Sequence, residues 1–170
     1  MGRGPNRLLQ DISEALHPQI EPYLDLLEIT DADKDAARLL LMILGPQIDD
    51  IIDRFYSKIR QSEVGFYIPD SIVDRLKKKQ RAHWAKLFSS KFDEDYSHSV
   101  HRIGIRHRDI NLGSSWYVAG CMILKMDLIN AILKADVAMI QKGRLLRAAE
   151  KYVALDMVIA LSAYDSGIVD

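Results

Sequence analysis

Cysteine is almost absent from this 170-residue sequence: Cys121 is the only one, so no disulfide can form within the chain. Residues 1–16 lack the long apolar stretch of a secretory signal peptide. No segment holds the roughly 18 uncharged apolar residues in a row that a membrane-spanning helix needs. These absences predict a cytoplasmic protein that does not insert directly into a membrane.

An excess of charge of either sign is also missing, because 23 basic residues stand against 24 acidic ones and leave a formal net charge of -1. Domains dedicated to nucleic acids usually carry a strong basic excess, so we expect no nucleic-acid partner. The sequence has no CxxCH motif for covalently attached haem, and no zinc-peptidase, P-loop, nucleophile-elbow or dinucleotide-binding motif. Histidines and carboxylates do not share a face, so a metal site with several protein ligands is not expected.

Glycine and proline are few, at 9 and 5 residues, and they fall between segments with helical periodicity. Strand patterns are nearly absent, so the sequence predicts an all-α protein of seven or eight helices in one domain. Thr30 is a good N-cap residue, and Ser114 or Ser115 is expected to cap a later, long helix. A gap is expected around 135–143. The predicted helices cover residues 8–16, 31–44, 47–60, 71–90, 93–108, 116–133 and a last segment that reaches about 164.

His83 interrupts the apolar face of the helix predicted over 71–90. It lies within about 20° of Leu76 around the helix axis, so it faces inward, and Lys79 and Gln80 flank it. Burying a polar side chain costs free energy unless it has a partner. One interpretation is a bound ligand at this position. The other is a core histidine with a protein partner, with Lys79 extending along the helix edge.

His107 shares one helix face with Val100 and Ile103. Gly104 lies beside them and has no side chain, so a bulky group can approach the backbone there. A neutral imidazole is a good iron ligand when a partner on its other nitrogen fixes its orientation. A histidine on an apolar face is more often structural, and that alternative stays open. His98 and His101 lie off this face, and we expect them at the surface.

Tyr56 follows Phe55 at the edge of another apolar stripe. A buried tyrosine hydroxyl usually finds a hydrogen-bond partner. In a gas-binding pocket that partner could be the gas, whereas elsewhere it would be solvent or a backbone carbonyl. Taken alone, these signals show only that two helices could present histidines to an apolar cleft.

The stretch from Arg102 to Gly120, RIGIRHRDINLGSSWYVAG, resembles the signature of the globin-coupled sensor family. That family has a histidine, then isoleucine and leucine at fixed offsets, then a Trp-Tyr pair that opens the next helix. Further similarities span nearly the whole chain. They comprise RFYSK at 54–58, VDRLK at 73–77, the pairs at 83–84 and 87–88, and LDM at 155–157 with Tyr164.

The resemblance implies an all-α, globin-like fold with an extra N-terminal helix and a shortened or missing D-helix region. A single sensor globin domain would span 1–170, with an N-terminal extension at 1–29 and the globin core at 30–170. The cofactor would be haem b (iron protoporphyrin IX), with His107 as the proximal iron ligand and Ile103 on the same face. Tyr117 matches a tyrosine that packs near that histidine, and Tyr56 matches one that donates a hydrogen bond to bound oxygen. Leu76 matches an apolar residue that controls access to the iron. Phe55 and Trp116 match aromatic residues of the pocket or core.

The sequence departs from the family pattern in three ways. Asn111 stands where glycine is common, and the usual proline before the Trp-Tyr pair is missing. Lys79 occupies a position that faces the distal pocket and is usually small. Lys79 could bond a ligand, coordinate iron if its pKa fell far below its usual value near 10.4, or extend to solvent, and we rank the last first. Gln80 and His83 are further candidates for a polar contact or a sixth ligand.

The resemblance implies that the chain is a non-catalytic sensor of a diatomic gas. Oxygen is the expected ligand, and carbon monoxide and nitric oxide are the other possible ligands. The chain would form a homodimer through its last two helices. An output domain outside this chain would serve chemotaxis or cyclic-di-GMP signalling. The alternatives are a haem enzyme such as a nitric-oxide dioxygenase, and a helical interaction domain without haem.

Overall fold

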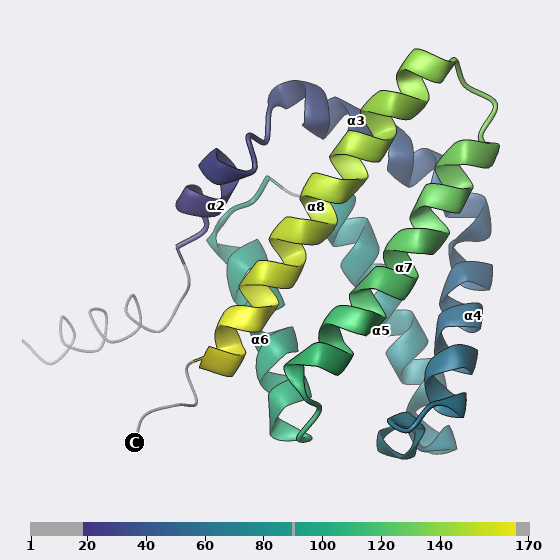
Figure 1. Cartoon of the computed structure of the whole chain (residues 1–170), viewed down its shortest axis with the longest axis vertical. Coiled ribbons are helices and arrows are strands. Elements are labelled where there is room, and N and C mark those ends of the chain that lie inside the picture. Colours follow the sequence, from purple (N-terminus) through teal and green to yellow (C-terminus); the bar gives the residue numbers. More distant parts are fainter. Residues whose placement is uncertain (1–18, 90, 166–170) are drawn as a thin grey trace, which may run out of the picture.

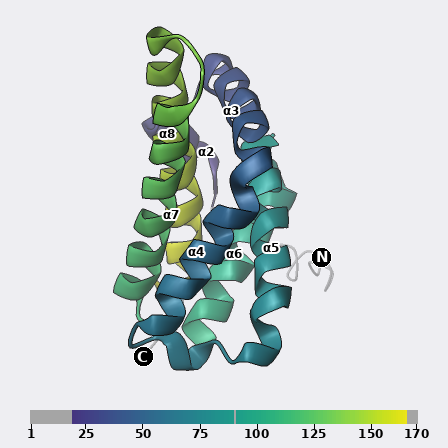
Figure 2. The ribbon, with the colours of Figure 1, turned by 90° about the vertical axis from the view of Figure 1, so that its right-hand side faces the viewer.

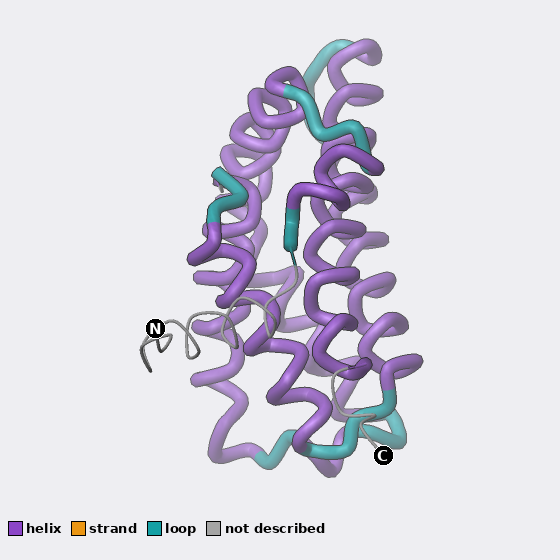
Figure 3. Tube along the Cα trace, turned by 90° about the vertical axis from the view of Figure 1, so that its left-hand side faces the viewer, coloured by secondary structure: helices purple, strands orange, loops and turns teal. Residues whose placement is uncertain are grey.

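The computed structural model describes residues 19–89 and 91–165, and all regular structure in these ranges is helical (Figures 1 and 3). The all-α prediction is therefore confirmed. The helix predicted over 8–16 lies outside the described residues. The α-helices are α2 (Glu21–Leu26), α3 (Asp31–Leu44), α4 (Ile48–Gln61), α5 (Asp70–Ser89), α6 (Glu94–Asp109), α7 (Ser114–Lys134) and α8 (Met139–Asp165).

The start of α3 follows the sequence closely. The Thr30 hydroxyl accepts a hydrogen bond from the Asp33 backbone N–H at 3.3 Å, and Asp33 accepts one from the Thr30 N–H at 2.9 Å. This capping box satisfies two backbone donors that a helix start leaves unpaired. At the other end, Gly45–Gln47 form a 3-10 turn that leads directly into α4. The expected break at Gly45-Pro46 is confirmed.

Two helix boundaries and one short helix differ from the prediction. Helix α7 begins after Gly113, which makes no side-chain cap, so the expected serine cap at Ser114 or Ser115 is wrong. Helix α8 begins at Met139 and contains Gly143, because the packing of a long helix outweighs the cost of one internal glycine. The short helix α2 was not predicted, since six residues are too few to show a helical period.

Helix α8 is the centre of the packing and crosses the face of the molecule seen in Figure 1. It packs against α6, α7 and α3. Its inward face is fully buried along most of its 27 residues. Its buried residues are Leu145, Ala148, Ala149, Tyr152, Leu155, Ile159, Ala160 and Ala163.

The contact between α6 and α8 depends on Gly104. A side chain at this position would collide with the backbone carbonyl of Ala160, and its Cβ would stand only 2.9 Å from the Ala163 Cβ. The close approach that the sequence predicts at Gly104 is therefore made by the α8 backbone. As a result, α6 is held directly against the central helix.

Helices α5 and α6 are consecutive but diverge from their connection (Figures 1 and 2). Helix α5 packs mainly on α3 and α4, whereas α6 packs mainly on α8. Between α4 and α5, residues 62–69 hold only the short 3-10 helix Gly65–Tyr67, which fits the expected shortened D region.

Helix α7 is the only helix in the described ranges that is long and apolar enough to span a membrane by these criteria alone. Two of its three charged residues have partners on other helices. Lys125 lies 3.1 Å from Glu150 on α8, and Asp127 lies 3.6 Å from Arg54 on α4. These ion pairs place α7 in the helical assembly, while much of its apolar surface stays uncovered.

Candidate functional site

The His107 ring is oriented by its own helix. Its Nδ1 atom lies 2.8 Å from the Ile103 carbonyl oxygen, one turn earlier in α6. A carbonyl can only accept, so Nδ1 carries the proton and donates, and Nε2 keeps its lone pair. Burial lowers the pKa of His107, although the bond to Ile103 opposes that shift. Within the described residues, no hydrogen bond to Nε2 is found, so a neutral nitrogen is available as a ligand.

Tyr117 holds the other side of the His107 ring. The two ring centroids are 5.0 Å apart, and the planes meet at 68° in an edge-on contact. Tyr117 is buried and in turn lies 6.2 Å from the ring of Tyr164 on α8. The turn that brings α7 back to His107 passes through Asn111, whose φ is 59°. Asparagine tolerates this left-handed conformation better than most residues, so it can replace the glycine common here.

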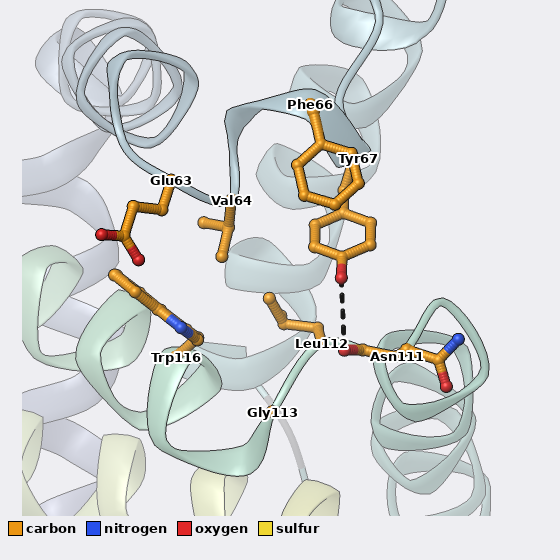
Figure 4. A pocket seen from close by; sticks show the side chains of 8 residues that line it. All are labelled: Glu63, Val64, Phe66, Tyr67, Asn111, Leu112, Gly113 and Trp116. Carbon is orange, nitrogen blue, oxygen red and sulfur yellow. Dashed lines mark hydrogen bonds between the residues drawn. The ribbon is translucent and has the colours of Figure 1, made fainter.

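A cavity of about 340 Å³ opens next to the end of α6 that carries His107 (Figure 4). Figure 4 shows one wall from the α4–α5 connection and the other from the turn into α7. The Tyr67 hydroxyl donates to the Asn111 carbonyl at 3.4 Å and joins the two walls. Trp116 is 40% exposed and contributes its indole to this wall. The lining residues are Glu63, Val64, Phe66, Tyr67, Asn111, Leu112, Gly113 and Trp116.

Tyr56 is more buried than its neighbour Phe55, with 7% of its surface exposed. Burial raises the pKa of Tyr56 to about 12, so its hydroxyl keeps its proton at neutral pH. This hydroxyl bonds to no residue in the described parts of the chain. Phe55 meets it edge-on at 5.2 Å, and the Phe55 ring lies against Gly120, where an added Cβ would stand 3.8 Å from two ring carbons. Tyr56 therefore offers an O–H donor in an apolar setting.

The predicted site residues on α5 differ in how far they are exposed to solvent. Leu76 is half-buried and packs against the core, and Gln80 is half-buried. Lys79 is exposed, which is the placement that we ranked first from the sequence. No contact between Lys79 and any site residue is found among the described residues.

His83 has a protein partner that sequence reasoning missed. Its Nε2–H donates to Oδ2 of Asp156 on α8 at 2.9 Å, and the Tyr96 hydroxyl donates to Oδ1 of the same carboxylate at 2.8 Å. Burial alone would lower the pKa of His83, but the charge and hydrogen bond of Asp156 raise it overall. The interpretation of His83 as a partnered core histidine is confirmed. The only signal for Asp156 was an acidic residue next to the apolar Leu155.

The expectation that His98 and His101 lie at the surface is wrong for His101. That residue is 6% exposed, and its Nδ1 lies 3.2 Å from the Ser162 hydroxyl. It is buried because α8 covers this face of α6. The His98 side chain is 28% exposed and lies 3.8 Å from Glu94. Across the described ranges, no group of three or more His, Cys, Asp or Glu side chains could hold a metal ion.

Of the predicted site residues, Ile103 and Tyr117 contact His107 directly. No hydrogen bond or ring contact between His107 and the other predicted site residues is found within the described part of the chain. Phe55 and Tyr56 contact each other, Trp116 lines the cavity, and His83 belongs to a separate cluster around Asp156. A metal bound here would have one protein ligand, the imidazole of His107. That donor set suits a planar cofactor that supplies four further ligands of its own.

Comparison with known proteins assigns the fold. The family model described as Protoglobin matches residues 16–167. The globin domain of the Geobacter sulfurreducens globin-coupled sensor is similar, with a TM-score of 0.79 and 18% identity over 85% of this chain and 96% of that one. The globin domain of E. coli DosC is similar in its ferric form I, with a TM-score of 0.73 and 17% identity over 85% of this chain and 98% of that one. Its ferrous form II gives a TM-score of 0.71 at 17% identity. These similarities confirm the predicted globin-like fold.

Proposed function

This chain belongs to the Protoglobin family, and we propose that it binds haem b through His107 and senses a diatomic gas, with oxygen as the expected ligand. Membership of a globin family implies haem binding. The observation that carries the proposal is the orientation of His107. Its Nδ1–H is tied to the Ile103 carbonyl, and its Nε2 is neutral and available.

The residues around His107 fit haem. A single neutral imidazole matches the axial ligation of globins, in which one histidine nitrogen binds the iron. The aromatic ring of Tyr117 lies edge-on against the imidazole and keeps it from turning. The cavity beside the turn into α7 would admit the edge of the porphyrin. Helices α5 and α6 would then form the two walls of the site.

Haem supplies the reversible binding of a diatomic gas at its iron. On the side opposite His107, this chain would contribute Tyr56. Its protonated hydroxyl has no partner among the described residues and can donate a hydrogen bond to a polar gas ligand. Oxygen acquires more negative charge than carbon monoxide on binding, so a donor here favours oxygen. Leu76 would restrict access, and Lys79 would stay in solvent.

A sensing role needs a path from His107 to the surface. Helix α6 carries His107 and lies against α8 at Gly104, without side chains between the two backbones. A shift of His107 along its ligand bond would therefore be passed to α8. Tyr117 and Trp116 offer a second path into α7. We assign the domain a non-catalytic, cytoplasmic role as the input of a signal transducer.

We also propose that α7 and α8 form a homodimer interface. Large apolar side chains are exposed at the end where these two helices meet. Leu133 is 52% exposed, Met139 79% and Ile140 71%, and Met126 further along α7 is 53% exposed. Only 22% of the most apolar stretch of α7 is buried within one chain. A second copy of the same surface would cover these side chains in a helical bundle.

The proposal is tested by absorption spectroscopy of the purified chain supplied with haem. We expect one haem per chain, a Soret band, and a ferrous form that binds oxygen reversibly. A chain that stays colourless with excess haem, although it is folded by circular dichroism, would contradict the proposal.

A further inference from the structure

A buried carboxylate on α8 joins the two helices that flank the proposed site. Asp156 accepts hydrogen bonds from His83 on α5 at 2.9 Å and from Tyr96 on α6 at 2.8 Å. The side chains of His83 and Asp156 are 12% and 13% exposed, and Tyr96 is 0% exposed. Loss of one member would leave a buried polar group unpaired, so the three side chains act as one unit.

The position of this unit along the helices is specific. His83 lies near the end of α5 at Ser89, and Tyr96 lies near the start of α6 at Glu94. Asp156 therefore joins α5 and α6 close to their connection. His107 lies about 16 Å further along α6, at a rise of about 1.5 Å per residue. Asp156 thus links the two helices at one end, and the proposed site lies near their opposite end.

Apart from this unit, the Lys86 ammonium group on α5 donates a hydrogen bond to the Asp95 carbonyl oxygen on α6 at 3.2 Å, at an exposed site. Each of these helices packs mainly on other helices, and the two diverge from their connection toward the end that carries His107 (Figure 1). Around Asp156, the rings of Phe92, Tyr96 and Tyr152 pack together, with Phe92 at 5.3 Å from Tyr96 and 4.8 Å from Tyr152. This packing closes the linked end of the two helices. The two hydrogen bonds of Asp156 are directional and part-buried, whereas the bond from Lys86 to Asp95 is exposed to competing water.

We propose that Asp156 is a positioning residue that fixes the separation of α5 and α6, and through it the placement of the distal side chains relative to His107. Asp156 contacts neither haem nor gas in this role. The claim about the helices stands without haem. Its consequence for haem retention rests on the proposed function.

The chemistry requires a carboxylate. Two donors approach Asp156 from different helices, and each needs an acceptor oxygen. Asparagine has only one such oxygen, so Asp156→Asn would present an N–H₂ group to one of the donors. Tyr96→Phe removes a single oxygen atom and breaks the link to α6 alone. Both changes nearly preserve side-chain volume.

Asp33 provides a matched control. It is also a buried aspartate, with a side chain 8% exposed, and it accepts a hydrogen bond from Lys151 on α8 at 2.8 Å. It joins α3 to α8 and does not link α5 with α6. Asp33→Asn therefore removes a comparable buried charge without loosening the proposed link.

The direct test measures the distance between α5 and α6 by pulsed electron spin resonance. Spin labels are placed at the exposed positions Lys78 and Arg106 by Lys78→Cys and Arg106→Cys, with Cys121→Ser in the background. We expect Asp156→Asn and Tyr96→Phe to shift and broaden the distance distribution, while Asp33→Asn leaves it as in the parent. Distributions for Asp156→Asn and Tyr96→Phe that match the parent would overturn the proposal.

The second readout is haem loss to an excess of apomyoglobin. We expect loss to be about tenfold faster in Asp156→Asn and Tyr96→Phe, and within about twofold of the parent in Asp33→Asn. Equal rates in all three variants would show a merely structural role and overturn the proposal. If Asp156→Asn does not fold, Tyr96→Phe decides by both readouts. A parent chain that takes up no haem would refute the proposed function, whereas the label distances would still decide the role of Asp156.

Discussion

The Nδ1 atom of His107 donates its proton to the Ile103 carbonyl oxygen at 2.8 Å, within the same helix. Because this bond spans one turn of α6, the helix itself fixes the tautomer. Tyr117 from α7 then restrains the ring from the side. The result is an imidazole whose second nitrogen is aimed by two independent contacts, as an axial iron ligand requires.

Tyr56→Phe should speed the dissociation of oxygen. The substitution removes one hydroxyl donor and keeps the ring, so its edge-on contact with Phe55 survives. A hydrogen bond to a partly charged ligand is worth enough to raise the dissociation rate about tenfold or more. Flash photolysis or stopped-flow mixing would measure it. Tyr152→Phe, in the aromatic cluster away from His107, serves as the control, and an unchanged rate in Tyr56→Phe would remove Tyr56 from the site.

The ion pair between His83 and Asp156 should make the stability of the haem-free chain depend on pH. Asp156 raises the pKa of His83 in the folded state, against the opposing effect of burial. When the pKa of a histidine is higher in the folded chain than in the unfolded chain, protonation stabilises the fold. This stabilisation is complete at pH values below the unfolded pKa, near 6.5, and is lost as the pH rises through the folded pKa. The difference in unfolding free energy between the parent and His83→Gln should shrink as the pH rises above about 6.5.

Urea unfolding of both proteins across that range would check the sign. Lys86 opposes the shift from the same helix, so Lys86→Gln should extend the stabilised range to higher pH. A difference that stays constant or grows with rising pH would show that His83 carries no charge in the folded chain.

Gly104→Ala should destabilise the fold by about 2–3 kcal/mol, because the added methyl group would collide with the Ala160 carbonyl. Gly143→Ala is the matched control. It lies in α8 with nothing within 4 Å of an added Cβ, and should gain up to about 1 kcal/mol from helix propensity. Chemical denaturation would measure both. Equal effects of the two substitutions would contradict the close contact of α6 with α8.

Charges placed at the exposed end of α7 and α8 should prevent dimerisation. Leu133→Glu with Ile140→Glu would introduce four like charges into a symmetric dimer and favour the monomer. Light scattering coupled to size-exclusion chromatography would show the change in mass. Met42→Glu, at a residue 75% exposed on α3, should leave the dimer intact. A parent chain that is monomeric at high concentration would refute the proposed interface.

Local features of the structure could be predicted from the sequence. The Thr30 cap, the turn at Gly45-Pro46 and the inward orientation of His83 each depend on residues a few positions apart. The contact of His107 with Ile103 follows the same local geometry. The tertiary partner of His83 could not be predicted, because it requires knowing that α8 packs between α5 and α6 at Asp156.

The error at His101 has the same origin. Helical periodicity placed it off the apolar face of α6, but it could not show that α8 covers this second face and offers Ser162 as a partner. Gly104 carried the signal of a close approach without identifying the element that approaches. For α8 itself, Gly143 suggested an interruption that tertiary packing removes. Helical periodicity thus predicts which face of a helix is apolar, but it does not predict which other helix packs against that face.

The central claim is that His107 Nε2 binds the haem iron. His107→Gly should purify with little haem, and added imidazole should restore haem binding and the ferrous spectrum of the parent by filling the space of the lost ring. His98→Gln, on the same helix, should keep a full complement of haem. A His107→Gly protein that holds one haem with the parent's ferrous spectrum, in the absence of imidazole, would contradict the account.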